Sequence, residues 1–350
     1  LGQGVIVKEP IGVVAAITPF NFPLYLNLSK VVPALAMGNS VVLKPAEQTP
    51  LSALRLAELI ADLLPGGTLN VVAGGRAAGE AIVRHPGVPR IGFTGSVPAG
   101  KAVMRTAADE LKVVTLELGG KNPLLLLPDV APERAAELAL IGMNLQRTAG
   151  QSCGSTSRVF AHRSLRPAFV EALAERLDAL VVGDPSAEET DVGPLAFEAH
   201  RDRVVDYIEL GQSEGATLRA GGADPPAGLE RGYYVRPTLL DDVEDGMRVA
   251  REEIFGPVVS VLEWESEDDL LERANALELG LTANVATNDL AAALRLSRAL
   301  EAGFVWVNGR GQRPLGAPFG GHKWSGLGEE NSLDELRSYT RLKHISLGGG

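Results

Sequence analysis

Short apolar runs alternate with longer helical segments along most of the chain, and this alternation restricts the possible folds more than any other feature. The runs IGVVAAITP (residues 11–19), SVVLKP (40–45) and TLNVVAG (68–74) are rich in β-branched residues. Four to eight apolar residues in a row are typical of a fully buried strand. Between two of these runs, LSALRLAELIADLL (51–64) has its leucines at helical spacing. The pattern predicts a doubly wound parallel α/β sheet.

A second alternation of this kind begins near Lys121, with PLLLLPD (123–129), and continues to FVWVNG (304–309). It contains a polar stretch rich in glycine and proline, RAGGADPPAGLERGYY (219–234), which predicts an exposed loop. A length of 350 residues suits two domains better than one. We therefore expect two α/β domains.

The charge balance excludes several classes of partner. A net charge of −11 argues against a nucleic-acid or anionic-membrane surface, because both need clustered lysines and arginines. Uninterrupted apolar stretches of 18 residues are absent from the sequence, so we expect no spanning helix. The single cysteine cannot form an internal disulfide and favours a reducing compartment. The sequence therefore predicts a cytoplasmic protein that binds small molecules or copies of itself.

Polar residues come directly after several predicted strands. In open α/β sheets, ligands bind at the carboxyl ends of the strands. Taken singly, each residue has an ordinary alternative: GSVPAG (95–100) can be a plain strand-to-helix turn, and Asn21 or Lys44 can be a capping or a solvated side chain. Glu117 is harder to explain as structural, because it precedes a glycine pair that permits close approach. The residues expected at this edge are Asn21, Lys44, Glu47, Ser96 and Glu117.

The segment TAGQSCGSTSR (148–158) contains the only cysteine of the chain. A lone cysteine is most often a small apolar side chain in the core. Here it lies among glycines and hydroxyl side chains, a setting that also suits a nucleophile. From this segment alone, both interpretations of Cys153 stay open.

Seven motifs in order resemble the aldehyde dehydrogenase superfamily, over nearly the whole chain. They are PFNFP (19–23), GNSVVLKPAEQTP (38–50), GFTGS (92–96), LELGGKNP (116–123), GQSCGSTSR (150–158), EEIFGPV (252–258) and PFGGHKWSG (318–326). Three features depart from the family pattern. Family chains are longer at the amino end, so an N-terminal segment with one arm of the oligomerisation hairpin is expected to be missing. Phe20 stands where tryptophan is commoner, and the carboxyl tail ends early.

The resemblance implies an architecture and an activity. Residues 1–120 would form an N-terminally incomplete NAD-binding domain with a Rossmann-like sheet, and residues 121–321 a second α/β domain, which is catalytic. Residues 322–350 would return to the cofactor domain and the oligomer interface. The implied enzyme oxidises an aldehyde to a carboxylic acid with NAD, or with NADP, and forms a homodimer or homotetramer. No metal is implied.

The resemblance also assigns catalytic roles that agree with the chemistry. Cys153 would attack the aldehyde, because hydride leaves most easily from a tetrahedral thiohemiacetal, and water would then hydrolyse the thioester. The Asn21 amide and the Cys153 N–H would stabilise the oxyanion. Glu117 would be the general base for hydrolysis. Lys30 and Glu330 match positions that relay a proton outward, with plain surface charges as the alternative.

The remaining assignments concern the cofactor and the substrate. Lys44 and Glu47 would lie at the adenosine ribose, where a carboxylate repels a 2′-phosphate and so favours NAD. Ser96 would lie at the pyrophosphate. Glu253 would hold the nicotinamide ribose, with Phe255 beside the nicotinamide. Phe319 would lie at the aldehyde entrance, unless it is a core aromatic. Further cofactor contacts are expected from Thr18, Pro19, Gly95, Leu118 and Gly119.

Two other functions remain possible from the sequence. A thiol-dependent esterase or acyl-transfer protein would use Cys153 and Glu117 without redox chemistry. A noncatalytic nucleotide-binding protein would need neither residue. An esterase would form no NADH from an aldehyde, which distinguishes it from a dehydrogenase. A noncatalytic protein would be recognised by the loss of a catalytic residue. Asn21, Glu117 and Cys153 are all present.

Overall fold

The computed structural model describes residues 3–309 and 314–348 of the chain. Within these residues the chain divides into two compact units. The first comprises residues 3–118, 314–320 and 326–348, and the second comprises residues 119–309 and 321–325. The chain passes from the first unit to the second between Leu118 and Gly119.

The first unit contains the predicted alternation of strands and helices. Its elements are β1 (Gln3–Pro10), β2 (Val13–Ile17), α1 (Pro23–Ala36), β3 (Ser40–Lys44), α2 (Leu51–Ile60), the 3-10 helix η1 (Ala61–Leu63), β4 (Leu69–Val71), α3 (Arg76–Arg84), β5 (Arg90–Thr94), α4 (Val97–Ala108), β6 (Val113–Glu117), β16 (Gly326–Leu327), α12 (Leu333–Ser338) and β17 (Thr340–Leu347).

The main sheet of this unit has the strand order β16-β6-β5-β2-β3-β4. The strands from β6 to β4 are parallel, and β16 joins the edge antiparallel to β6. From β2 the chain continues first to β3 and β4 on one side, and then to β5 and β6 on the other. The order of the strands therefore reverses at β2, which is where doubly wound sheets bind ligands.

Residues of β2 alternate between two separate cores, as the two-residue repeat of a strand requires. Val14 and Ala16 join a cluster with Val31 of α1 and Tyr339. Ala15 and Ile17 belong to a second cluster, on the face covered by α3 and α4. Both faces of the sheet are therefore buried, which explains why its strands are nearly uninterrupted apolar runs.

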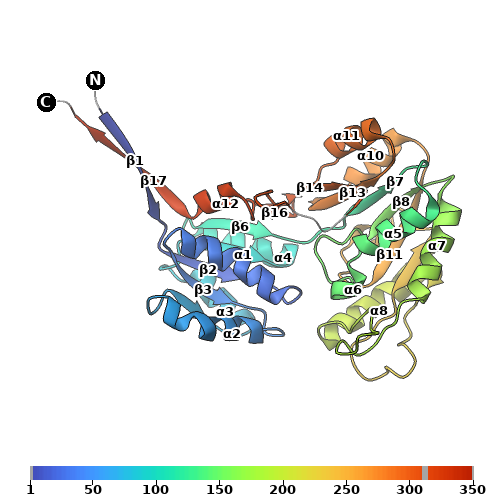
Figure 1. Cartoon of the computed structure of the whole chain (residues 1–350), viewed down its shortest axis with the longest axis horizontal. Helices are drawn as coiled ribbons and strands as arrows, with labels where there is room; N and C mark the ends of the chain where they lie inside the picture. The colour runs from blue at the N-terminus through green and yellow to red at the C-terminus, as the bar shows by residue number, and fades with distance from the viewer. Residues whose placement is uncertain (1–2, 310–313, 349–350) are drawn as a thin grey trace. The chain divides into compact units, whose positions relative to one another are not determined.

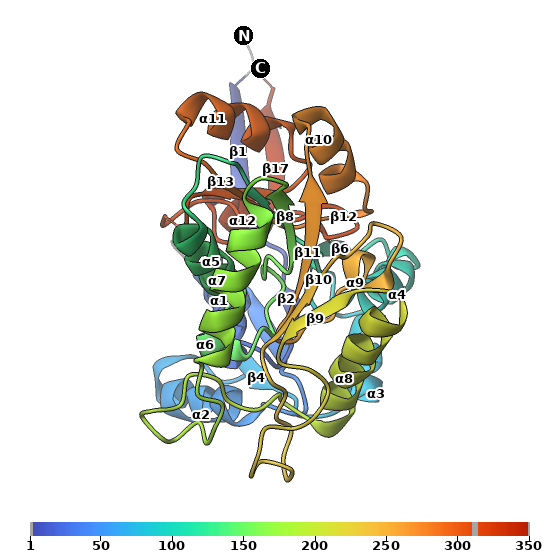
Figure 2. The same ribbon diagram turned by 90° about the vertical axis from the view of Figure 1, so that its right-hand side faces the viewer.

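The second unit has a sheet of its own, with the order β14-β13-β7-β8-β11-β10-β9. All its neighbours are parallel except β9 and β10. Strands β13, β8, β11, β10 and β9 are labelled in Figure 2. Its elements are β7 (Pro123–Leu126), α5 (Pro132–Gly142), α6 (Leu145–Thr148), β8 (Arg158–His162), α7 (Arg166–Asp178), α8 (Glu198–Ser213), β9 (Thr217–Ala220), β10 (Thr238–Asp241), α9 (Arg248–Arg251), β11 (Val258–Trp264), α10 (Glu267–Asn275), β12 (Leu279–Gly280), β13 (Thr282–Ala286), α11 (Leu290–Ala299), β14 (Phe304–Val307) and β15 (His322–Lys323).

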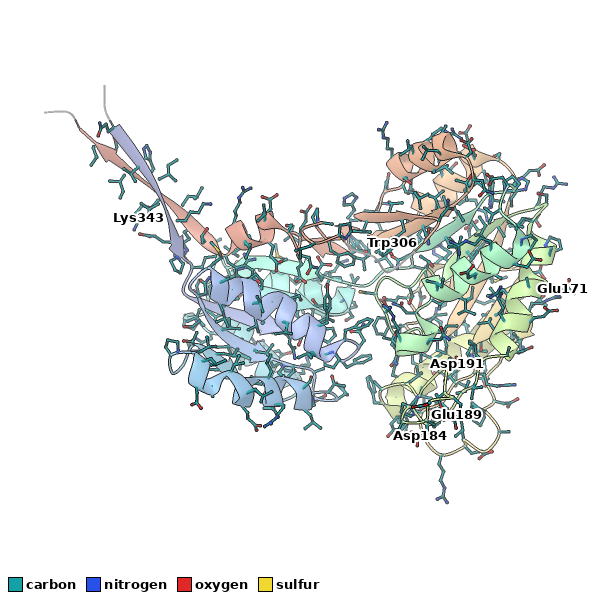
Figure 3. All side chains as sticks on the ribbon, in the orientation of Figure 1. Glu171, Asp184, Glu189, Asp191, Trp306 and Lys343 are labelled. Carbon is teal, nitrogen blue, oxygen red and sulfur yellow. The ribbon has the colours of Figure 1, made fainter. Side chains whose placement is uncertain are left out.

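The first and last strands of the described chain pair with each other. β1 and β17 run antiparallel side by side (Figure 1), in register from Gln3 opposite Leu347 to Pro10 opposite Thr340. Lys343, labelled on β17 in Figure 3, forms an ion pair with Glu9 on β1. Apolar side chains on this two-stranded sheet are exposed, among them Ile6 and Leu342.

The predicted α/β fold with parallel sheets is confirmed. The two units differ from the expected domains in three places. Residues 119–120 and 322–325 belong to the second unit. Residues 314–320 belong to the first unit, because Phe319 pairs with Glu330 through two backbone hydrogen bonds of 2.8 and 2.9 Å. Residues 1–2, 310–313 and 349–350, which the expected domains include, lie outside the described residues. Over the described ranges, the helices lack the combination of length and apolar character that crossing a membrane requires.

Candidate functional site

The carboxyl ends of β3, β2, β5 and β6 form one edge of the first unit's sheet. Ile17 pairs with Lys44 on one side and with Phe93 on the other, and Thr94 pairs with Glu117. Adjacent strands are about 4.8 Å apart, so the whole edge spans roughly 15 Å. The structure therefore brings the polar residues predicted at the ends of these strands to one edge of the unit.

Lys44 and Glu47 are neighbours at the end of β3. Lys44 is buried, and its Nζ donates to the Pro45 carbonyl at 3.1 Å. Burial lowers the pKa of Lys44, and the charge of Glu47 opposes this effect. Glu47 is exposed, and its Oε2 lies against the backbone before α3, since a Cβ at Gly75 would be only 2.5 Å away. The site can therefore offer an exposed carboxylate beside an amine.

The turn after β5 leads into the N-terminus of α4. Ser96 is the N-cap, and its Oγ accepts from Ala99 N at 3.4 Å. Gly95 N donates to the Glu117 carbonyl at 3.0 Å, and the Leu118 side chain packs against Gly100 of the helix. The N-terminus of a 12-residue helix next to a strand edge is a suitable place for a phosphate group.

The segment after β2 is tied to its neighbours by hydrogen bonds. Thr18 N donates to the Lys44 carbonyl at 3.1 Å, and Thr18 Oγ1 donates to Oδ1 of the buried Asn27 at 2.5 Å. Pro19 and the half-buried Asn21 come next, and α1 begins two residues after Asn21. Asn21 thus lies at the strand switch point, on a short and well-anchored connection.

Glu117 ends β6 and is 4% exposed. Thr115, two residues earlier on the same strand face, accepts a 3.1 Å hydrogen bond from Arg90 on β5. Arg90 pairs with Val14, whose side chain packs with α1 and Tyr339. Because side chains alternate along a strand, Glu117 also points to the face of the sheet that α1 covers.

Lys30 lies on this same face of the first unit. It is fully buried and forms an ion pair with Glu330, which is also buried. Its aliphatic chain packs over β5, since a Cβ at Gly92 would be 3.5 Å from Lys30 Cδ. The alternative that Lys30 and Glu330 are plain surface charges is therefore wrong.

Cys153 lies in the second unit, in the loop between α6 and β8, and is half-buried. Asn122 holds this loop: its Nδ2 donates to the carbonyls of Cys153 at 2.7 Å and Ser155 at 2.9 Å. Gly150 has a φ of +75°, and a Cβ there would lie 2.4 Å from the Gly256 carbonyl oxygen. The cysteine therefore lies on a rigid loop that needs glycine at position 150. If Cys153 were only a small apolar side chain of the core, the loop would not need such anchoring.

Glu253 lies against the glycine pair that opens the second unit. Gly120 N donates to Glu253 Oε1 at 3.2 Å, and a Cβ at Gly119 would be 1.9 Å from Oε2. Burial raises the pKa of Glu253 to about 7. Lys121, 2% exposed, has its pKa lowered to about 7 by burial and next by the charge of Arg158, while Glu253 opposes this. A side chain at position 119 would therefore displace the Glu253 carboxylate from this position.

Two residues on α8 contact this segment and were not among the predicted site residues. Nε2 of His200 lies 2.8 Å from the Phe255 carbonyl oxygen, and Arg203 Nη2 donates to the Glu253 carbonyl at 2.6 Å. Phe255 has a φ of +63°, which is uncommon for an aromatic residue and marks a constrained backbone. Sequence separations of 50 and 55 residues leave no local pattern that could have identified these contacts.

The remaining predicted residue, Phe319, is 5% exposed and pairs with Glu330 through its backbone. The first unit thus collects Thr18, Pro19, Asn21, Lys30, Lys44, Glu47, Gly95, Ser96, Glu117, Leu118 and Phe319. The second unit collects Gly119, Cys153, Glu253 and Phe255. Chemically, the first group can bind a nucleotide and supply a carboxylate base, and the second can supply a thiol nucleophile and a further carboxylate. Over the described ranges, His, Cys, Asp and Glu side chains form no group that could hold a metal ion.

Comparison with known proteins gives consistent matches over nearly the whole chain. The model of the aldehyde dehydrogenase family matches residues 2–345. A betaine aldehyde dehydrogenase of Sinorhizobium fredii is 47% identical over 344 residues, which are 98% of this chain and 70% of that protein.

Solved structures give the same result. An NAD⁺ complex of an aldehyde dehydrogenase from Bacillus cereus matches with a TM-score of 0.94 and 42% identity, over 99% of this chain and 72% of that chain. A Mycobacterium tuberculosis aldehyde dehydrogenase complexed with NAD⁺ matches with a TM-score of 0.95 and 40% identity, over 99% of this chain and 71% of the other.

Proposed function

Because the chain belongs to the aldehyde dehydrogenase family and oxidises aldehydes with NAD, we propose that Cys153, Glu117 and Asn21 carry the reaction. The observation that carries this proposal is the anchored loop of Cys153, in which Asn122 binds the carbonyls of Cys153 and Ser155. A nucleophile held in one position loses little entropy when it attacks.

The Cys153 thiolate attacks the aldehyde carbon, and the new C–S bond gives a tetrahedral thiohemiacetal. The Asn21 side-chain amide and the Cys153 N–H donate hydrogen bonds to its oxyanion, a kind of stabilisation that typically contributes about 3 kcal/mol. Collapse of the adduct leaves a thioester on Cys153. NAD, when bound, would supply the acceptor for the hydride that leaves the adduct in that step.

Glu117 completes the cycle as the general base. Its carboxylate takes a proton from a water molecule, and the resulting hydroxide attacks the thioester and releases the acid and the thiolate. Lys30 and Glu330, on the same face of the sheet, then carry the proton away from Glu117. The ion pair and the burial of both side chains support this relay.

The first unit fits a dinucleotide at its strand switch point. Lys44 and Glu47 would hold the adenosine ribose, and Ser96 with the N-terminus of α4 the pyrophosphate, while Thr18, Pro19, Gly95 and Leu118 complete this edge. In the second unit, Glu253 would hold the nicotinamide ribose, with Gly119 and Phe255 beside it. The space that glycine leaves for Glu253 at position 119 supports this assignment.

An aldehyde panel tests the function directly. NADH formation is monitored with betaine aldehyde, the substrate named for the Sinorhizobium relative, and with octanal, named in a related structure from Pseudomonas syringae. Each is assayed with NAD and with NADP. NADH formation that depends on both aldehyde and protein is expected, and its absence with every aldehyde would favour the thiol esterase alternative.

Replacing Glu47 with glutamine is expected to shift cofactor choice toward NADP. In the parent, a 2′-phosphate would lie beside the Glu47 carboxylate, at a cost that the neighbouring Lys44 offsets only in part. The ratio of kcat/KM for NAD over NADP should fall about tenfold in the variant, which corresponds to about 1.4 kcal/mol. Glu58→Gln, which neutralises an exposed carboxylate on α2, should leave the ratio unchanged. An equal ratio in parent and Glu47→Gln would place Glu47 away from the ribose.

We further propose that the chain forms a homodimer or homotetramer in the cytoplasm. β1 and β17 carry exposed apolar side chains, and a two-stranded sheet has little stability by itself. Light scattering should give the mass of two or four chains, and a stable monomer would contradict the proposal. The cytoplasmic location is supported by a single cysteine that must stay reduced to react.

A further inference from the structure

Four charged side chains are buried together on the α1 and α12 face of the first unit's sheet. Lys30 and Glu330 form an ion pair there. Arg90, on β5, is 1% exposed, and Glu335, on α12, is 5% exposed. Charges in an apolar interior are costly unless each is compensated, so the partners of each group decide its ionisation state.

Arg90 is fixed by neutral groups. Its Nη1 donates to the Ser338 carbonyl at 2.9 Å, its Nη2 donates to Thr115 Oγ1 at 3.1 Å and Ser338 Oγ at 2.9 Å, and its guanidinium lies 4.1 Å from the ring centroid of Tyr339. Lys30 and Tyr339 meet over Gly92, where a Cβ would be 3.5 Å from Lys30 Cδ and 3.8 Å from Tyr339 Oη. The cluster is therefore compact.

Glu335 has a local role as well, in an arrangement at the start of α12 that is like a capping box but reaches the residue before the N-cap. Ser332 is the N-cap, and its Oγ accepts from Glu335 N at 3.2 Å. Oε2 of Glu335 in turn accepts from Asn331 N. The second oxygen, Oε1, is buried and accepts no hydrogen bond from any residue that the structure describes. Capping therefore accounts for only one of the two carboxyl oxygens.

We propose that Glu335 is a positioning residue of the proton relay, a second carboxyl group that shares one proton with Glu330 beside Lys30. A proton on the buried oxygen Oε1 removes the cost of an ionised carboxylate with one unpaired oxygen. The cluster then holds Lys30 and Arg90 as cations and one carboxylate charge. When the shared proton leaves, two carboxylate charges balance the two cations.

The surroundings of Glu335 shift the pKa of its carboxyl group in both directions. Burial, and next the charge of Glu330, raise the pKa of Glu335 to about 7, while the Asn331 N–H, Lys30 and Arg90 lower it. Tyr339 is buried at the end of α12, and burial raises its pKa, so it stays neutral. The charged side chains of β17, Arg341 and Lys343, are exposed. The shared proton is therefore released close to neutral pH.

The consequence for the relay rests on the proposed function. A proton that leaves Glu117 reaches Lys30, and Lys30 passes a proton from Nζ to a carboxylate oxygen of Glu330. This transfer needs a carboxylate that is free to accept it. Ionisation of Glu335 increases the negative charge beside Glu330 and makes Glu330 a better acceptor. Glu335 thus sets the pH at which the relay accepts protons from the site.

Replacing Glu335 with glutamine separates the capping role of this side chain from its ability to ionise. The amide oxygen still accepts from Asn331 N, since glutamine also serves in capping boxes, but the side chain cannot ionise. A carboxyl group whose pKa is raised on folding stabilises the protein below its ordinary pKa of about 4.5, and this contribution is lost as the pH rises to about 7. The melting temperature of Glu335→Gln relative to the parent should therefore rise by about 3 °C between pH 5 and pH 8.

The second measurement is the rate of acid release after the first burst of NADH, at pH 6 and at pH 8. Because the glutamine side chain cannot ionise, no extra negative charge develops beside Glu330 as the pH rises, and the increase in rate between pH 6 and pH 8 becomes smaller than in the parent. The ratio of the rate at pH 6 to the rate at pH 8 should increase about fivefold.

The matched control is Ser332→Ala, which removes the cap on Glu335 N and keeps the carboxyl group. Its melting temperature should be lower by the same amount at every pH, with an unchanged rate ratio. If the melting temperatures of Glu335→Gln and the parent differed by the same amount at every pH, the proposal of a shared proton would be wrong. A pH-dependent melting temperature with an unchanged rate ratio would overturn the role in the relay. Failure of the proposed function itself shows separately, as a parent that forms no NADH.

Discussion

Cys153→Ala is expected to lose aldehyde-dependent NADH formation by a factor of about 10³ or more, because no other group in the loop can form the thiohemiacetal from which hydride leaves. The change removes one sulfur atom from a loop that Asn122 and Gly150 hold through backbone contacts. The loop should therefore keep its conformation, and the melting temperature should change little.

The affinity for NAD provides the control for this variant. Lys44, Glu47 and Ser96 belong to the first unit, so the affinity measured by calorimetry should stay within about twofold of the parent. Dehydrogenase turnover by Cys153→Ala at the parent's rate would exclude the covalent mechanism. A joint loss of NAD binding and turnover would instead show that the substitution had disrupted the fold.

Glu117→Gln is expected to stop the enzyme after one turnover. The thiol still attacks and hydride still leaves, so a burst of about one NADH per site should appear. Hydrolysis then lacks its base, and the steady-state rate should fall by about 10²- to 10⁴-fold. Mass spectrometry of the quenched protein should find the acyl group on Cys153.

The matched control is Glu329→Gln, which removes an exposed carboxylate from the same unit and should leave both phases unchanged. A steady-state rate for Glu117→Gln equal to that of the parent would show that another group activates the water. A missing burst would place Glu117 in the activation of the thiol itself.

Several inner strands of both sheets could be predicted from the sequence, because a strand buried on both faces is an apolar run, as in SVVLKP and PLLLLPD. The edge strand β9 (Thr217–Ala220) could not, since it is partly exposed, and its last two residues fall in the stretch predicted as a loop. Helix α3 is not identified by the same pattern, since RAAGEAIVR is mostly small and charged residues with a single buried valine. The residues at the strand ends were predictable for the same reason as the strands, because the end of an apolar run marks the carboxyl end of its strand.

The buried charges could not be predicted. Lys30 and Glu330 are 300 residues apart, and nothing local shows that the two side chains meet in the interior. Glu335 fits the sequence pattern of a capping box, and that pattern gives no information on the burial of its second oxygen. Lys121 comes after two glycines, where a lysine is ordinarily solvated, yet it is 2% exposed. Such groups depend on tertiary contacts that local patterns do not encode.

The backbone at Gly150 has a consequence for how this protein can diverge. A positive φ and a carbonyl oxygen within 2.4 Å of a Cβ together exclude every residue except glycine at that position. Substitutions in the loop are therefore tolerated only at positions whose side chains have room. A substitution at position 150 would change the loop conformation that positions the Cys153 thiol. A lineage that altered this loop would lose the nucleophile's placement before it could gain a new one, so the loop should change more slowly than the surface around it.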